Sequence, residues 1–371
     1  MITIWQYLRR LATSLVNYDA PYDEERLGWE PRSFRRWSRN YLKSARLGTA
    51  AVCLLLIDLV IIGLLLHTLH PLITLLRQNE ALFRPQVTLT RQGTPRIFDR
   101  PDRRKVPRIL HQTCANETIP DVWVHSQRSC INAYSDFEYK LWTDERARYF
   151  LSSEYPWFLD TWDNYAFPIQ RADSIRYFVL YHYGGVYLDM DTFCNEAVPI
   201  HQIETDTAAH TALFKATLPT GVTNDFMISS ARHPAFAAAI SQLPAFHRIT
   251  RLWARLQPYS AIMVSSGPLF LSLVVEDYLL VQPSLPSPTV KVISPSQLTP
   301  YMTDLESATW HREDAQAFMW LGDKPWAWFG LGIVGLVACI YVLNRVLLVV
   351  WGAFLSTIHS TTNLTKVAKL L

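Results

Sequence analysis

Two long apolar runs interrupt an otherwise mixed pattern of hydrophobic and polar positions. The run Leu47–His67 contains one charged residue, Asp58, and the run Trp326–Trp351 contains two strongly polar residues, Asn344 and Arg345. An α-helix rises about 1.5 Å per residue, so about 20 apolar residues cross the ~30 Å hydrocarbon core of a bilayer. The pattern therefore predicts two transmembrane helices, with a large domain between them.

Flanking charges predict the orientation of the first helix. Six Lys and Arg residues lie within the 20 residues before it, and two lie within the 20 residues after it. Basic residues next to a membrane span favour the cytosolic side, so we expect a cytosolic N-terminus and a luminal middle domain. The flanks of the second helix are balanced and do not orient it. The predicted organisation is a cytosolic segment at 1–46, a membrane helix at 47–67, a membrane-proximal connector at 68–104, a luminal domain at 105–325, a membrane helix at 326–351 and a cytosolic tail at 352–371.

Between the two apolar runs, short apolar strands alternate with amphipathic helices. The strands are expected at Val106–Thr113, Phe137–Asp144 and Gly185–Cys194, and the helices at Leu72–Phe83, Glu145–Leu159 and Ile169–Tyr183. This alternation predicts an α/β fold with a largely parallel sheet. Ligands of such sheets bind beyond the carboxyl ends of the strands.

The composition narrows the class of protein. Of the 371 residues 49% are apolar and 18% are charged, below the ~25% charged content of a typical soluble domain, which agrees with a membrane-anchored protein. The net charge of +3 is too small to indicate a nucleic-acid partner. The cysteines of the middle domain, Cys114, Cys130 and Cys194, allow one disulfide and one free thiol, and the pairing stays open.

Two carboxylates, Asp189 and Asp191, follow the apolar part of the third predicted strand. Side chains two residues apart on a strand project to the same side, and like charges there repel unless a cation lies between them. Mn²⁺ and Mg²⁺ prefer oxygen ligands and leave positions open for phosphates. The preceding helix carries Arg171 and Asp173 near its start. The pattern therefore predicts a divalent metal and a diphosphate-bearing substrate, without selecting the nucleotide.

Longer blocks of sequence resemble a known family. The blocks PRILHQT, YKLWTDE, YPWFLDTWDNY, PIQRADSIRYFVLYHYGGVYLDMD and SSGPLF are similar to those of the DxD-containing fungal mannosyltransferases of glycosyltransferase family 32. Within that family the chain resembles most closely the catalytic subunits of mannosyl-inositol-phosphoceramide synthase, over residues 105–315. The resemblance implies a GT-A-type α/β domain, a retaining reaction, GDP-mannose as donor, Mn²⁺ or Mg²⁺ as metal, and inositol phosphoceramide as acceptor.

The resemblance also implies roles for individual residues. It assigns the metal to Asp189, Asp191 and His311, although Arg312 and Glu313 follow His311 where the family has Gly and Asp. It assigns donor binding to His111, Gln112, Arg171, Asp173, Gly184 and Gly185. It assigns catalysis, near the transferred sugar and the acceptor, to Asp189, Asp191, Asn224 and Asp225.

A lipid acceptor would explain the two membrane helices, because a ceramide does not leave the bilayer and the enzyme must be held next to it. We expect a Golgi membrane protein with both termini in the cytosol. A regulatory membrane subunit, or a second copy of the chain, is expected to contact Asp58, Asn344 and Arg345. Two alternatives stay open: an α-1,6-mannosyltransferase that acts on protein-linked glycans, and a non-catalytic scaffold or regulatory subunit.

Overall fold

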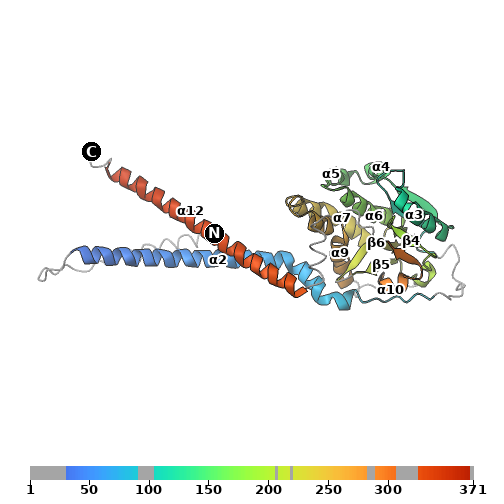
Figure 1. Ribbon diagram of the computed structural model, residues 1–371, viewed down its shortest axis with the longest axis horizontal. Coiled ribbons are helices and arrows are strands. Elements are labelled where there is room, and N and C mark those ends of the chain that lie inside the picture. Colours follow the sequence, from blue (N-terminus) through green and yellow to red (C-terminus); the bar gives the residue numbers. More distant parts are fainter. Residues whose placement is uncertain are drawn as a thin grey trace. The chain divides into compact units, whose positions relative to one another are not determined.

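The computed structural model describes residues 31–90, 104–204, 208–217, 220–281, 289–305 and 325–367, and it divides into two compact units (Figure 1). One unit comprises residues 1–62 and 340–371, and the other comprises residues 63–339. The predicted function depends on the second unit, which contains the sheet.

Two long helices carry the apolar runs. Helix α2 is Pro31–Leu82 and helix α12 is Pro325–Val367. Their apolar parts have mean hydropathies of 2.6 and 2.4 and are long enough to cross a membrane. Within the first unit, Asn344 Nδ2 donates to Asp58 Oδ2 at 2.9 Å, which gives the expected polar partner to Asp58. The separate helix predicted at Leu72–Phe83 is wrong, because α2 continues through Pro71 to Leu82.

A third apolar segment, Pro258–Val281, also has the length and composition of a membrane span. It consists of two helices, α8 (Pro258–Ser265) and α9 (Pro268–Val281), separated by Ser266 and Gly267. Of the most apolar 18 residues of this segment, 56% are buried inside the structure, whereas 0% are buried in the other two spans. Its apolar residues therefore build the core of the domain.

The second unit contains a six-stranded sheet in the order β2-β1-β3-β6-β5-β7. The strands are β1 (Ile109–Thr113), β2 (Glu138–Trp142), β3 (Gly185–Leu188), β5 (Ala212–Ala216), β6 (Val222–Ser229) and β7 (Val290–Ile293). The pairs β1–β2, β1–β3 and β5–β7 are parallel, whereas β6 runs antiparallel to β3 and β5. The α/β class is confirmed, but the sheet is mixed rather than largely parallel. The short β5–β6 connection accounts for this, since a crossover to a parallel neighbour needs a dozen or more residues.

Helices and short elements complete the domain. The helices are α3 (Asp121–Ala133), α4 (Asp144–Glu154), α5 (Leu159–Asp163), α6 (Pro168–Tyr183), α7 (Pro234–Thr250) and α10 (Pro295–Leu298), with 3₁₀ turns at Pro156–Phe158 and Ile200–Gln202. A separate two-stranded sheet pairs β4 (Thr192–Cys194) with β8 (Met302–Asp304). Helices α6, α7 and α9 lie together against the main sheet (Figure 1).

Alternation along the strands divides the core into two clusters. Tyr187 of β3 packs with Tyr177, Phe214 and Phe270, whereas its neighbours Val186 and Leu188 pack in the other cluster. Successive strand residues face opposite sides of a sheet, so β3 is buried on both faces. Because β3 is central and fully buried, it fixes the position of the residue that follows it, Asp189.

Two predicted elements are shorter in the structure. The helix expected at Glu145–Leu159 ends at Glu154, and a 3₁₀ turn beginning at Pro156 follows, because proline does not fit a helix interior. The strand expected at Gly185–Cys194 divides into β3 and β4. Residues 189–191 form the turn between them.

A disulfide joins Cys130 on α3 to Cys194 on β4, and Cys114 is free. This agrees with the predicted count of one bridge and one free thiol in the middle domain. The bond closes a sequence separation of 64 residues. Replacing both cysteines by serine is expected to lower the free energy of unfolding by about 4 kcal/mol, because the unfolded chain gains entropy. Urea unfolding of the two forms measures this, and equal midpoints would contradict it.

Candidate functional site

The two aspartates of the DxD sequence lie in the turn that follows β3. Asp189 N donates to Asp225 O at 3.0 Å, which extends the β3–β6 ladder by one residue. Thr192 N donates to Asp189 O at 3.2 Å and closes the turn. Asp189 therefore lies at the carboxyl end of a central strand, as predicted. Asp191 lies in the turn itself, so strand alternation does not set the direction of its side chain.

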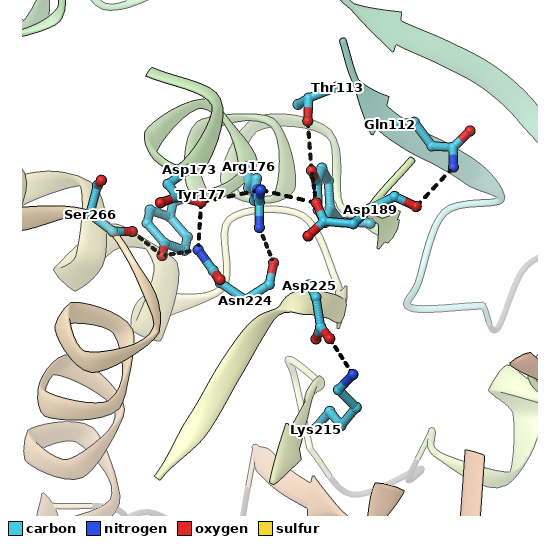
Figure 2. Close-up of polar contacts among 11 residues, drawn as sticks. Gln112, Thr113, Asp173, Arg176, Tyr177, Asp189, Lys215, Asn224, Asp225 and Ser266 are labelled. Carbon is cyan, nitrogen blue, oxygen red and sulfur yellow. Dashed lines mark hydrogen bonds and ion pairs between the residues drawn. The ribbon is translucent and has the colours of Figure 1, made fainter. Parts of the chain in front are cut away.

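The Asp189 carboxylate has several protein partners (Figure 2). Tyr187 Oη donates to Asp189 Oδ1 at 2.7 Å, and Thr113 Oγ1 lies 2.8 Å from the same hydroxyl. Arg176 Nη2 lies 3.0 Å from Asp189 Oδ1, and Gln112 donates to the Asp189 carbonyl at 3.3 Å. Burial raises the pKa of Asp189 to about 7, against the opposing effect of Arg176. Additional positive charge beside this carboxylate would lower its pKa.

Arg176 on α6 links the two sides of the site. Its guanidinium lies 3.1 Å from Asp173 Oδ1 and 3.0 Å from Asp189 Oδ1, and it donates to Asn224 O at 2.9 Å. It also lies 5.0 Å from the centre of the Tyr187 ring. Sequence reasoning did not select Arg176, because an Asp–Arg pair three residues apart is common on exposed helices. The available signal was an Asp–Arg pair at the start of a helix whose next turns, with Tyr177, Phe178, Val179 and Leu180, are apolar and buried.

Asp173 and Asn224 lie behind Arg176 rather than on an open surface. Both are buried, and Asn224 Nδ2 donates to Asp173 Oδ1 at 3.0 Å and to Tyr177 Oη at 3.2 Å. Tyr177 in turn donates to Ser266 O at 2.6 Å. Burial raises the pKa of Asp173 to about 6, while Arg176 opposes the shift. These contacts support the position of Arg176, and the predicted contacts of Asp173 and Asn224 with the donor or sugar stay predictions.

Asp225 is directed away from its neighbour Asn224, toward Lys215 of β5 (Figure 2). Its Oδ2 forms an ion pair with Lys215, whose Nζ also lies 3.8 Å from Asp304 Oδ2. Burial acts to lower the pKa of Lys215, but Asp225 and Asp304 outweigh it and raise the pKa. Asp225 Oδ1 is buried and has no hydrogen-bond partner. Lys215 and Asp304 were not predicted, because only the β5–β6 and β4–β8 pairings bring them to this site.

Replacing Lys215 by methionine is expected to lower the free energy of unfolding by about 3 kcal/mol, because it leaves the Asp225 carboxylate buried without its counter-ion. The double variant Lys215→Met, Asp225→Leu is expected to recover most of this loss, since neither charge remains. Chemical unfolding of the parent, of Lys215→Met, of Asp225→Leu and of the double variant measures the coupling between the two side chains. Losses that simply add would show that the ion pair does not contribute.

His111 and the two glycines occupy a tightly packed part of β1 and β3. Trp142 Nε1 donates to His111 Nδ1 at 3.0 Å, and His111 Nε2 donates to Gly184 O at 2.8 Å. Gly184 and Gly185 have φ values of +69° and +105°, and a Cβ on Gly185 would collide with Ile109 O. The glycines begin β3, at the opposite end from Asp189. Their position gives no support to the predicted donor contact, and His111 has both ring nitrogens engaged by protein groups.

The stability of the domain should depend on the protonation of His111. Burial lowers the pKa of His111 from 6.5 to about 4. The unfolded chain takes up a proton below pH 6.5 that the folded protein resists, so His111 is expected to remove about 3 kcal/mol of stability as the pH falls from 6.5 to 4. Unfolding of the parent and of His111→Gln at several pH values measures this difference. Equal pH slopes would contradict the prediction.

Arg171 and Gln112 lie at the carboxyl edge of the parallel strands. Arg171 Nη2, near the start of α6, lies 3.5 Å from Asp144 Oδ2 at the start of α4. The Arg171 side chain is only partly buried, so a ligand can reach it. Gln112 also accepts a hydrogen bond from Tyr139 Oη at 3.2 Å. Donor binding by these residues stays a prediction.

His311 lies outside the described residues. The last described residue before it, Leu305, donates its backbone N–H to Asp191 O at 3.1 Å. The chain therefore leaves the described region directly beside the DxD turn. The predicted contact of His311 with the metal stays a prediction.

The side chains around the DxD turn offer oxygen ligands to a divalent metal. Within the described part of the chain, no cluster of three or more His, Cys, Asp or Glu side chains is arranged to hold one. The donors that are present fit a hard cation, since the turn carries two carboxylates, Asp189 and Asp191. Asp225, whose buried Oδ1 has no hydrogen-bond partner, is paired with Asp189 through the backbone. Such ions bind through one or two carboxylates together with substrate phosphates. The residues therefore fit Mn²⁺ or Mg²⁺ bound jointly with a diphosphate.

Comparison with known proteins places this site in a family. Residues 120–210 match the family described as a glycosyltransferase sugar-binding region containing a DXD motif. A mannosyl phosphorylinositol ceramide synthase of Saccharomyces cerevisiae is 40% identical over 222 residues, which are 58% of this chain and 54% of that protein. Inositol phosphoceramide mannosyltransferase 1 of Schizosaccharomyces pombe is 33% identical over 228 residues, 59% of this chain and 67% of that protein.

A solved structure, the PaToxG glycosyltransferase, is similar to 48% of this chain and 72% of its own, with a TM-score of 0.34 and 10% identity. The chain spans about half the length of the first yeast relative.

Proposed function

The chain belongs to the family of DXD-containing glycosyltransferases that includes the inositol phosphoceramide mannosyltransferases, and from this membership we propose that it transfers mannose from GDP-mannose to inositol phosphoceramide. One observation supports the proposal above the others. Asp189 is held at the carboxyl end of β3 by Arg176, Tyr187 and Gln112, beside the unpartnered Asp225 Oδ1. This arrangement suits a nucleotide diphosphate and a cation.

Asp189 and Asp191 would hold the divalent cation, with His311 as a further ligand from the segment that follows Leu305. When bound, the ion supplies positive charge to the diphosphate as it departs. Arg171 would contact the donor at the same edge of the sheet. Arg176 would keep Asp189 ionised and oriented, since its guanidinium is fixed on the opposite side by Asp173 and Asn224.

We propose a retaining reaction without a protein base. The sugar–phosphate bond breaks, the inositol oxygen bonds to the anomeric carbon on the same face, and its proton passes to the departing phosphate oxygen. His111 is not available as a base, because both ring nitrogens have protein partners. Asp225→Asn tests this step. Complete loss of turnover with intact donor binding would contradict it and assign the proton to the Asp225 carboxylate.

The domain is proposed to lie in the Golgi lumen, with both termini in the cytosol. The basic flank of the first span favours this topology, and the Cys130–Cys194 disulfide agrees with an oxidising compartment. Asn344 Nδ2 donates to Asp58 Oδ2, whereas Asp58 Oδ1 and the side-chain oxygen of Asn344 have no hydrogen-bond partner. A regulatory membrane subunit or a second copy of the chain would bind there.

The acceptor distinguishes the proposal from its nearest alternative. The full chain is reconstituted in vesicles with GDP-mannose and Mn²⁺, and offered inositol phosphoceramide and a soluble mannose-containing glycan together. We expect mannose on the lipid. Transfer to the glycan alone would contradict the proposal and identify a protein-glycan mannosyltransferase, and no transfer to either acceptor with an intact fold would indicate a non-catalytic subunit.

A further inference from the structure

The end of α7 and the turn that follows it carry an unusual pattern of exposed residues. Three Arg–aliphatic pairs recur at intervals of three and four residues: Arg248–Ile249, Arg251–Leu252 and Arg255–Leu256. Ile249, Leu252 and Leu256 are 62%, 80% and 86% exposed, and the three arginines are exposed as well. We call residues 248–256 the basic-apolar segment.

The exposed residues of the basic-apolar segment belong to an ordered element. Trp253 N donates to Thr250 O, and Gln257 N donates to Trp253 O, both at 3.1 Å. Ala254 is 2% exposed and Thr250 is fully buried, so the segment is attached to the domain on its inner side. The aliphatic side chains therefore remain on the outside, although their burial is favourable by about 1.5–3 kcal/mol each. Such a surface indicates a binding partner.

The charge of the segment identifies the chemistry of that partner. No acidic residue occurs between Asp225 and Glu276, so the arginines have no carboxylate neighbour along the chain. Among the residues that the structure describes, no ion pair includes Arg248, Arg251 or Arg255. Arginines with free donors beside large aliphatic side chains are suited to a surface that is anionic outside and apolar beneath.

We propose that the basic-apolar segment binds the surface of an anionic bilayer. Two helices of this chain have the length and hydropathy to span a membrane, which makes a bilayer the partner that this chain itself suggests. Ile249, Leu252 and Leu256 enter the boundary between headgroups and acyl chains, and the arginines bind lipid phosphates. This contact is independent of the transfer reaction and of the identity of the acceptor.

Site-specific fluorescence on the full chain tests the proposal. Cys53, Cys114 and Cys339, the free thiols among the described residues, are replaced by alanine or serine, and one cysteine is introduced by Leu252→Cys. The matched control is Val122→Cys on α3, an aliphatic position that is 68% exposed. Both proteins carry an environment-sensitive dye and are reconstituted as single copies in nanodiscs that contain nitroxide lipids.

The label at position 252 is expected to shift its emission to the blue and to be quenched by the nitroxide lipids in discs that contain phosphatidylserine, and the label at 122 to show neither effect. Arg251→Gln and Arg255→Gln are each expected to lower the ratio of bound to unbound segment by about fivefold. Equal quenching at the two positions would overturn the proposal. If the blue shift at position 252 increased with protein density and did not depend on lipid charge, the partner would be a protein and the proposal would be overturned.

Discussion

Replacing Arg176 by methionine is expected to remove mannosyl transfer and to lower the free energy of unfolding by about 3–5 kcal/mol. The guanidinium lies between Asp173 and Asp189 and donates to Asn224 O. All of these contacts are lost together, so the buried Asp173 carboxylate and the partly buried Asp189 carboxylate remain without their counter-ion. Arg176→Lys keeps the charge but not the forked geometry, so we expect an intermediate loss.

Arg148→Met is the matched control for this variant. Arg148 also forms an ion pair, with Asp163, but both side chains are about half exposed. Exposed pairs of this kind contribute little to stability, because solvent screens the attraction. Urea unfolding and product formation are measured for the three variants and the parent. If Arg176→Met and Arg148→Met lost similar stability, the buried network would not support the site as we describe it.

Replacing Asp191 by asparagine is expected to lower turnover about a thousandfold, because the site loses a carboxylate that would hold the cation and with it several kcal/mol of charge stabilisation. The backbone contact of the turn is kept in this variant, since the Asp191 carbonyl that accepts from Leu305 N is unchanged. Unfolding of the variant in urea separates an effect on folding from an effect on turnover. The variant should also need a higher Mn²⁺ concentration for half-maximal rate.

Asp136→Asn controls for the loss of one carboxylate. Asp136 is exposed and pairs with Arg108 on the surface of the domain, away from the DxD turn in sequence and in contacts. Its rate and its Mn²⁺ dependence should match those of the parent. An Asp191→Asn protein with the parent's rate and Mn²⁺ dependence would exclude Asp191 as a metal ligand.

Local patterns predicted the elements that hold the turn. The apolar run before Asp189 does form a central strand, and the helix expected at Ile169–Tyr183 is present as α6, one residue longer. Periodicity depends on residues that are close in the chain, so it identifies strands and helices well. Strands β5, β6 and β7 were not predicted, and because periodicity does not define pairing, neither was the antiparallel position of β6.

The parts of the site that were not predicted depend on contacts between distant residues. Lys215 reaches Asp304 because β5 and β8 come together in the folded domain, and no local pattern indicates that meeting. Arg176 has one acidic partner three residues away, but its second partner is Asp189 in the turn after β3. Family resemblance assigned Asn224 and Asp225 to one place, whereas their side chains contact different elements (Figure 2).

The most direct test of the proposed function is a reaction with defined components. The full chain is purified, reconstituted with inositol phosphoceramide, and given GDP-mannose labelled in the sugar, with Mn²⁺ or with a chelator. We predict a labelled mannosyl-inositol-phosphoceramide that disappears with the chelator, returns on addition of Mn²⁺, and is absent for Asp191→Asn. Equal product with and without the chelator, or no labelled lipid from a folded protein, would contradict it.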